Sequence, residues 1–289
     1  MVPGADAADR LTAPSGARRQ SGTLLITLTA ATREAQALRF RAFLLLLLPW
    51  TACGAEETLR IAVAASFRAT LEKIVPRFES SHPARCRISS AATGVLYAQL
   101  VNGADFDLLL AADDQITGEL VRAGLVRPEG RILYAYGQLI LIARGASLQD
   151  ATSARVAALV AGSSGRIALA NPATAPYGLA AQRTLEALDL WQLTRGRRAV
   201  GQNAAQVLQY FLTGNVDYAF VSLGQWHNGG AGSGHSYWRV PQALYPPLRQ
   251  EAVLLARSAH RPAASDFLHF LHSAEVRQLL LADGYGVEP

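Results

Sequence analysis

From Glu57 onward the sequence alternates short apolar strands with amphipathic helices, and this alternation limits the fold more than any other feature. The stretches of strand length are TLRIAVAA, CRISSA, DLLLAA, RIALAN, RRAVGQ and VDYAFVSL. The stretches between them space their apolar residues as a helix does, as in the series Phe67, Leu71, Ile74, Val75 and Phe78. This order predicts an α/β chain with parallel sheets and helices on both faces of each sheet.

Two longer β-rich runs interrupt the alternation, RILYAYGQLILIAR at 131–144 and ALYPPLRQEAVLLAR at 243–257. Such runs are longer than one ordinary strand needs, so we expect the chain to leave one lobe, build a second and return. A ligand cleft between the lobes follows from that path. We expect 56–138 to form the first part of lobe 1, 139–245 to form lobe 2, and 246–289 to return to lobe 1. The Gly-rich segment at 227–235 is predicted to be a surface loop.

The N-terminal part carries a predicted export signal at 39–55. Arg39 and Arg41 precede the apolar run AFLLLLLPW, which is too short to span a bilayer, and the small residues of TACGA follow it. Cleavage after Ala55 would give a periplasmic protein. Cys53 offers a competing interpretation as a lipoprotein anchor, which we favour less because Trp50 stands where a small aliphatic residue is expected. We expect residues 1–38 to be a disordered extension or the result of a wrongly assigned start codon.

The net charge does not indicate nucleic-acid binding. Of the formal charge of +5, residues 1–55 carry +3, from six arginines against Asp6, Asp9 and Glu34, so the remaining body carries only +2. That body has no Arg/Lys stripe interleaved with aromatic residues. We therefore expect no nucleic-acid partner.

Small or polar residues stand at four points where a predicted strand ends and a helix begins. These turns are Ala65-Ser66, Ala92-Thr93-Gly94, Ala175-Pro176-Tyr177-Gly178 and Gln202-Asn203-Ala204. The first turn of a helix exposes unpaired N–H groups and the positive end of the helix dipole, so converging turns would bind an anion without a cation. Each turn alone is an ordinary helix cap. Four of them after strand ends, where open α/β sheets bind ligands, favour a site.

Several of these stretches resemble the periplasmic molybdate-binding proteins of bacterial ABC transporters. The resemblance covers about Leu59 to Gly286 and is carried by IAVAASFRATLEKI, SSAATGVLYAQLVNGADFDLLLAADD, ANPATAPYG, GNVDYAFVSLGQW and LYPPLRQ. It implies a two-lobed type II periplasmic-binding-protein fold, with two α/β sandwiches joined by two crossover strands and a ligand cleft between them. It also implies a molybdate or tungstate ligand. The implied ligand residues are Ser66, Thr93, Tyr177 and Ala204, the last two through backbone N–H groups.

The sequence departs from the family pattern at several of these positions. Thr93 stands where serine is common and Ala204 where valine is common. Some members carry a hydroxyl residue at the position of Ala65 and a tyrosine at the position of Ser222. Further candidate contacts are Ala65, Asn203 and Ser222.

We interpret the chain as a solute-binding protein rather than an enzyme. We expect no cofactor, a monomer, and the permease and ATPase subunits of a molybdate transporter as partners. A binder of phosphate, sulfate or a small organic acid in the same fold is the alternative. A hydrolase with Ser66 or Ser222 as nucleophile is a rival from another class. Asp113 and Asp114 are predicted to cap a helix rather than bind a metal, and His269 and His272 to be a surface pair.

Overall fold

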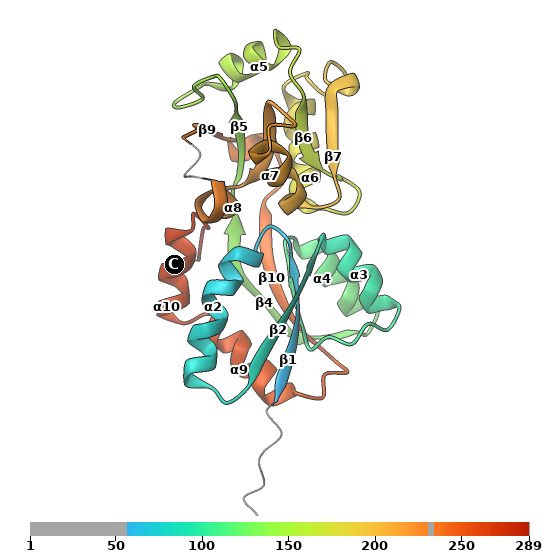
Figure 1. Cartoon of the computed structure of the whole chain (residues 1–289). Helices are drawn as coiled ribbons and strands as arrows, with labels where there is room; N and C mark the ends of the chain where they lie inside the picture. Colours follow the sequence, from blue (N-terminus) through green and yellow to red (C-terminus); the bar gives the residue numbers. More distant parts are fainter. Residues whose placement is uncertain (1–56, 231–233, 289) are drawn as a thin grey trace, which may run out of the picture. The chain divides into compact units, whose positions relative to one another are not determined.

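The structure is a computed structural model that describes residues 57–230 and 234–288, in which the strands form two sheets (Figure 1). The predictions for 1–38, the export signal at 39–55 and Cys53 lie outside the described residues. Each sheet and its helices make one lobe. The change of sheet falls at Gln138, since one strand ends at Gly137 and the next begins at Leu139.

Lobe 1 is built on a sheet of strand order β2-β1-β3-β10-β4. Its strands are β1 (Thr58–Ala64), β2 (Arg85–Ala91), β3 (Leu108–Ala111), β4 (Val126–Gly137) and β10 (Leu248–Leu255). Lobe 2 has the order β7-β6-β8-β5-β9. Its strands are β5 (Leu139–Ala143), β6 (Ile167–Ala170), β7 (Arg198–Gly201), β8 (Tyr218–Ser222) and β9 (Tyr237–Arg239).

Both sheets are mixed, which corrects the prediction of parallel sheets. In lobe 1, β1 runs parallel to β2 and β3, whereas β10 is antiparallel to β3 and β4. In lobe 2, β6 runs parallel to β7 and β8, whereas β5 is antiparallel to β8 and β9. The antiparallel pairs involve the strands next to the crossings between lobes. A strand that enters a sheet from the other lobe need not follow the direction set by the strand-helix-strand units.

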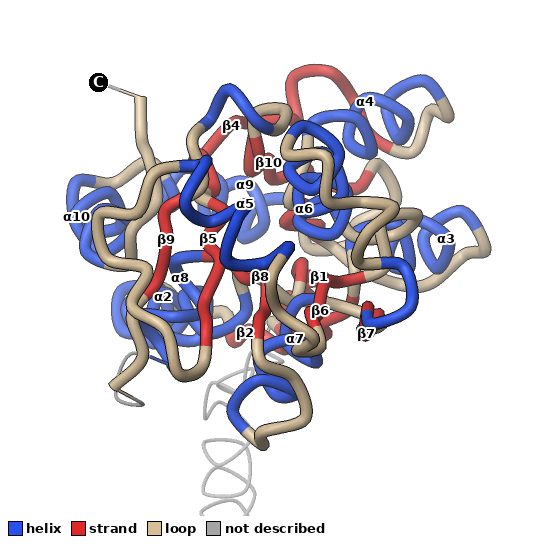
Figure 2. The backbone as a smooth tube through the Cα atoms, turned by 90° about the horizontal axis from the view of Figure 1, so that it is seen from above, coloured by secondary structure: helices blue, strands red, loops and turns tan. Residues whose placement is uncertain are grey.

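Helices cover both faces of each sheet. Lobe 1 holds α2 (Arg68–Ser81), α3 (Thr93–Val101), α4 (Asp114–Arg122), α9 (Arg261–Leu271) and α10 (Ala274–Ala282). Lobe 2 holds α5 (Ser153–Ala161), α6 (Pro176–Ala187) and α7 (Ala204–Leu212), and Figure 2 shows α6 and α7 on opposite sides of the sheet. Short helical turns complete the described chain: η1 (Arg195–Arg197), α8 (Leu223–Gln225), η2 (Trp226–Gly230) and η4 (Gln242–Leu244). None of the helices in the described residues is long and apolar enough for a membrane span.

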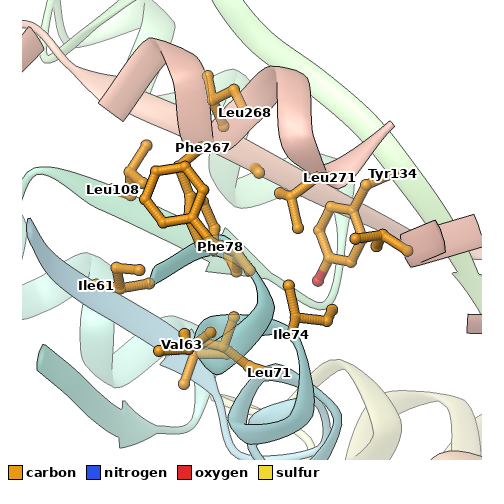
Figure 3. Close-up of a cluster of buried hydrophobic side chains, with 14 of the residues drawn as sticks. Ile61, Val63, Leu71, Ile74, Phe78, Leu108, Tyr134, Phe267, Leu268 and Leu271 are labelled. Atoms are coloured by element: carbon orange, nitrogen blue, oxygen red, sulfur yellow. The ribbon is translucent and has the colours of Figure 1, made fainter. Parts of the chain in front are cut away.

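In the core of lobe 1, the apolar residues that recur at helical spacing in the sequence lie on one face of α2 and pack against the sheet and α9. Leu71, Ile74 and Phe78 of α2 are buried against Ile61 of β1 and Phe267 of α9 (Figure 3). Burying each such side chain stabilises the fold by ~1.5–3 kcal/mol. This packing holds α2 directly after β1, which fixes the turn between them.

The outgoing and returning chains meet at the crossing. Gly137, the last residue of β4, pairs with Leu248, the first residue of β10. The side chain of Gln138 donates hydrogen bonds to the Val240 carbonyl at 3.1 Å and to the Tyr245 hydroxyl at 3.0 Å. We call Gly137, Gln138 and Leu248 the hinge, because the chain passes from one lobe to the other here.

Three elements differ from the sequence interpretation. We did not predict α5 or the three-residue strand β9. The segment predicted as a surface loop begins with the π-helical turn η2, and its residues 231–233 are outside the described chain. The turn is held because Asn228 donates hydrogen bonds to the Gly224 carbonyl at 2.7 Å and to the Asp283 carboxylate at 2.8 Å.

Candidate anion-binding site

The four turns singled out in the sequence come together around one small cavity. Its empty volume, including the part open to solvent, is about 200 Å³. Its lining residues come from both lobes and are Ala64, Ala65, Ser66, Ala92, Thr93, Ala112, Ala175, Pro176, Tyr177 and Ala204. The space among these residues is small, so it suits a compact ion rather than a drug-sized molecule.

Ser66 reaches the cavity because β1 ends at Ala64 and α2 begins at Arg68, which leaves a tight turn between them. Ser66 is only 4% exposed and lines the cavity. The Ser66 carbonyl accepts hydrogen bonds from the Tyr285 hydroxyl at 3.1 Å and the Ser222 hydroxyl at 3.3 Å. These bonds fix the Ser66 peptide. The amide of Ala65 is already used, since it donates to the Ala91 carbonyl at 2.9 Å.

Thr93 is the first residue of α3 and is fully buried. Its hydroxyl oxygen accepts a hydrogen bond from the Ala112 amide at 3.2 Å. Because that bond uses a lone pair, the hydroxyl proton remains available for an acceptor in the cavity. The next amide along, that of Gly94, donates across to the Thr174 carbonyl of lobe 2 at 2.9 Å.

Lobe 2 contributes the starts of two helices. Pro176 occupies the first position of α6, where its missing N–H leaves nothing unsatisfied, and Tyr177 follows it. Ala204 begins α7, and Asn203 caps that helix by accepting a hydrogen bond from the Gln206 amide at 3.1 Å. Asn203 is therefore engaged by its own helix and does not line the cavity.

Ser222 is also outside the cavity lining. It is fully buried at the end of β8, where its hydroxyl accepts a hydrogen bond from the Gln225 amide at 3.1 Å and caps α8. Of the seven candidate residues, the structure thus brings five to the cavity: Ala65, Ser66, Thr93, Tyr177 and Ala204. Asn203 and Ser222 act as helix caps beside it.

The electrostatics of the cavity come from main-chain dipoles. No charged side chain is among its lining residues, and the first turns of α3, α6 and α7 begin at it. Unpaired N–H groups and the positive ends of helix dipoles favour an anion at such a point. The lining includes no histidine or carboxylate that could serve as a base or bind a metal cation.

Asp113 lies just beyond the cavity, in a second space between the lobes that is also lined by Gly94 and residues 172–176. As predicted, it caps α4, because its carboxylate accepts a hydrogen bond from the Ile116 amide at 2.8 Å. Burial raises the pKa of the Asp113 carboxyl to about 6. Among the described residues there is no group of three or more metal-binding side chains.

The matching family model is that of the bacterial extracellular solute-binding proteins, and it spans residues 59–286. The chain belongs to this family. The molybdate-binding protein ModA of Azotobacter vinelandii is 35% identical over 238 residues, which cover 82% of this chain and 93% of that protein. ModA of Rhodobacter capsulatus is 31% identical over 230 residues, covering 78% and 87% respectively.

The solved structures within this fold agree with the family assignment. The periplasmic molybdate-binding protein of Azotobacter vinelandii matches with a TM-score of 0.74 at 30% identity, covering 80% of this chain and 100% of that one. The predicted type II periplasmic-binding-protein fold is thereby confirmed.

A larger space exists in lobe 2, beside Trp226, Trp238 and Arg239, but none of the four turns reaches it. The small cavity between the lobes is therefore the candidate site. Sequence reasoning missed two of its features, the bond from Gly94 to Thr174 and the position of the Tyr177 side chain, because both depend on contacts between distant segments.

Proposed function

We propose that this protein binds molybdate or tungstate in the periplasm and delivers it to the permease and ATPase subunits of an ABC transporter. The observation that carries the proposal is the single cavity lined by Ser66, Thr93, Tyr177 and Ala204. The ModA proteins of Azotobacter vinelandii and Rhodobacter capsulatus, to which this chain is similar, are named as molybdate-binding proteins. In this role the chain is a monomer with no cofactor, and it makes and breaks no covalent bond.

The proposed contacts are the hydroxyl groups of Ser66 and Thr93 and the main-chain amides of Ser66, Thr93, Tyr177 and Ala204. Each hydrogen bond to a charged group contributes ~1.5–3 kcal/mol, so six of them supply a gross ~9–18 kcal/mol. After the entropic cost of association, micromolar or tighter binding is expected.

Selectivity follows from the chemistry of the lining. A phosphate that carries a proton needs an acceptor, and the cavity has no carboxylate or histidine to provide one. Sulfate is a smaller tetrahedral ion, so donors fixed by helix starts would lie too far from its oxygens. Molybdate and tungstate are nearly equal in size, so both are proposed ligands.

Binding requires the lobes to separate and close again. Ser66, Thr93, Tyr177 and Ala204 are between 0% and 5% exposed, which leaves no open path for an ion. We assign 56–138 and 246–289 to one moving body and 139–245 to the other. We also propose that the segment at 39–55 directs export of the protein to the periplasm.

Isothermal titration calorimetry with a panel of anions tests the function. We expect molybdate and tungstate to bind with micromolar or lower Kd, and sulfate and phosphate to bind at least about tenfold more weakly, a difference of ~1.4 kcal/mol. A flat response to molybdate and tungstate at tens of micromolar would contradict the proposal. A preference for sulfate, phosphate or an organic acid would favour the alternative ligand in the same fold.

A further inference from the structure

Tyr177 touches both the anion cavity and the hinge. It lines the cavity at the start of α6 in lobe 2, and its ring is packed in the apolar cluster that also contains Leu139 and Leu248 beside the crossing. A Cβ atom placed on Gly137 would lie 2.2 Å from the Tyr177 hydroxyl oxygen and 3.0 Å from its Cζ. The end of the phenol therefore rests directly on the hinge backbone, at the last residue of β4.

The hydroxyl at this contact is not held by a hydrogen bond. Tyr177 Oη is fully buried and has no hydrogen-bond partner among the described residues, and burial raises the pKa of this phenol well above its ordinary value. The Ser222 hydroxyl is near enough to oppose that rise in part. Its own hydrogen bonds, however, join it to Ser66 and Gln225.

A buried hydroxyl without a hydrogen-bond partner normally lowers stability. We therefore look for a steric role of the Tyr177 side chain rather than a polar one. Gly137 has no side chain, and this allows the phenol to approach the backbone of lobe 1 from lobe 2. Because protein interiors are close-packed, a rigid ring against a backbone sets a definite limit to the approach of two bodies.

We infer that the Tyr177 side chain is a positioning residue that sets the end point of lobe closure by resting on Gly137. This inference rests on the proposed function, because it concerns how the lobes close around the anion. The end point fixes the distance between the donors of lobe 1 and those of lobe 2. Tyr177 thereby links the hinge to the size of the cavity, and so to the choice of anion.

Three variants and one control test this contact. Gly137→Ala places a methyl group against the phenol oxygen, Tyr177→Phe removes that oxygen while keeping the ring, and the double variant combines them. Gly118→Ala in α4 is the control, since its added Cβ would have only Arg131 Nη1 nearby, at 3.8 Å. Gln250 Nε2 would lie 2.8 Å from the added Cβ of residue 137 and belongs to a buried side chain that donates to the Ala112 carbonyl at 3.4 Å, so the double variant isolates the part of the effect that comes from the phenol oxygen.

Molybdate titration of each full-length variant gives the first result. We expect Gly137→Ala to weaken molybdate binding at least tenfold, and the double variant to recover most of that loss because the atom nearest to the added methyl group, the phenol oxygen, is then absent. Small-angle scattering should show compaction on adding molybdate in every variant except Gly137→Ala. If the double variant binds as weakly as Gly137→Ala, the inference is wrong.

A second variant covers the case in which Gly137→Ala does not fold. Tyr177→Leu shortens the side chain. Compared with Tyr177→Phe, which keeps the ring, we expect it to bind molybdate at least tenfold more weakly and to show a smaller preference for molybdate over sulfate. A Tyr177→Leu protein with wild-type affinity and selectivity overturns the inference.

Failure of the proposed function is recognised separately, by a wild-type protein that binds neither molybdate nor tungstate. The contact is then judged from melting temperatures without any anion, with wild type, Gly137→Ala, Tyr177→Phe and the double variant forming a double-mutant cycle. Tyr177→Phe should recover most of the melting temperature lost in Gly137→Ala. Strictly additive changes would contradict the contact itself.

Discussion

The amide of Gly94 in lobe 1 donates a hydrogen bond of 2.9 Å to the carbonyl oxygen of Thr174 in lobe 2. Gly94 is the second residue of α3, directly after Thr93, and Thr174 precedes the turn that carries Tyr177. The bond therefore joins the two lobes beside the cavity. It also uses one first-turn amide of α3 for closure, which leaves the Thr93 amide and hydroxyl for the anion.

A side chain at residue 94 should hinder this closure. An added Cβ would lie 3.1 Å from both the Cα and the carbonyl oxygen of Thr174, a gap that a small shift can relieve. We expect Gly94→Ala to lose less than about threefold in molybdate affinity and Gly94→Val, whose branches need more room, to lose about tenfold or more, equal to ~1.4 kcal/mol. Calorimetry measures both, with Gly118→Val as the control for a branched residue in a helix. Equal affinities for Gly94→Val and wild type would show that closure does not need this contact.

The Thr93 hydroxyl should contribute to anion binding by donating a hydrogen bond to the anion. Thr93→Ser keeps the hydroxyl, so we expect its molybdate affinity to remain within about threefold of wild type. Thr93→Ala removes the hydroxyl and should cost ~1.5–3 kcal/mol of binding free energy. It also leaves the buried Ala112 amide without its partner, which should lower the free energy of unfolding by ~1–3 kcal/mol.

Calorimetry and denaturant unfolding separate the two effects at Thr93. Ser66→Ala is the comparison, because Ser66 also lines the cavity and the loss of its hydroxyl should weaken binding with little effect on unfolding. If Thr93→Ala and Thr93→Ser bind molybdate equally, the hydroxyl does not contact the anion.

The sequence predicts the strand-helix units well, because local periodicity and turn chemistry determine them. The helix at 204–212 and the strand ends before Ser66 and Thr93 are visible in the apolar pattern alone. The sequence does not predict what the side chains do where lobes meet. Gly94 and Thr174, or Gly137 and Tyr177, are far apart along the chain, and nothing local to either member indicates its partner.

Short or weakly patterned elements were missed for a related reason. Strand β9 has three residues and is placed by pairing with β5, so its formation depends on the neighbouring strand more than on its own sequence. Asn203 and Ser222 illustrate the limit for site residues. Each has a side chain able to contact an anion, yet each is engaged by the helix that it caps.

Asp283 should be important for stability. Its carboxylate accepts hydrogen bonds from Thr70 at 2.8 Å, from Lys73 at 2.7 Å and from Asn228 at 2.8 Å, and it is 4% exposed. It thereby joins α2 and η2 at the end of α10. We expect Asp283→Ala to lower the free energy of unfolding by ~3 kcal/mol, since it leaves buried polar groups unpaired.

Chemical denaturation of Asp283→Ala, with Asp266→Ala as the control, measures this contribution. Within the described residues, the one polar partner of the Asp266 carboxylate is His82 at 3.3 Å, and the Asp266 side chain is 58% exposed, so its loss should change stability little. Similar unfolding free energies for the two variants would contradict the role given to Asp283.

Asp113 should make stability depend on pH in the opposite direction to most carboxylates. Burial, followed by the nearby charges of Asp114 and Glu119, raises its pKa from the ordinary 3.8 to about 6, while bonds from the Ile116 and Gln115 amides oppose the rise. The folded protein therefore holds this proton more tightly than the unfolded chain does. The contribution of this raised pKa to the free energy of unfolding is fully present below pH 3.8 and is lost as the pH rises through about 6.

Asp113→Asn is the matched variant, because asparagine caps helices about as well as aspartate and carries no charge. We expect the variant and the wild type to have similar unfolding free energies at pH 4, and the variant to be the more stable at pH 7.5. Asp266 of α9, whose side chain is 58% exposed, provides the control variant Asp266→Asn, for which no such gain with rising pH is expected. Above pH 6 the wild-type charge beside the cavity also repels an anion, so Asp113→Asn should bind molybdate more tightly at pH 7.5. Denaturation at the two pH values decides the matter: a stability difference between Asp113→Asn and wild type that does not grow from pH 4 to pH 7.5 would show that this carboxyl titrates as an exposed one.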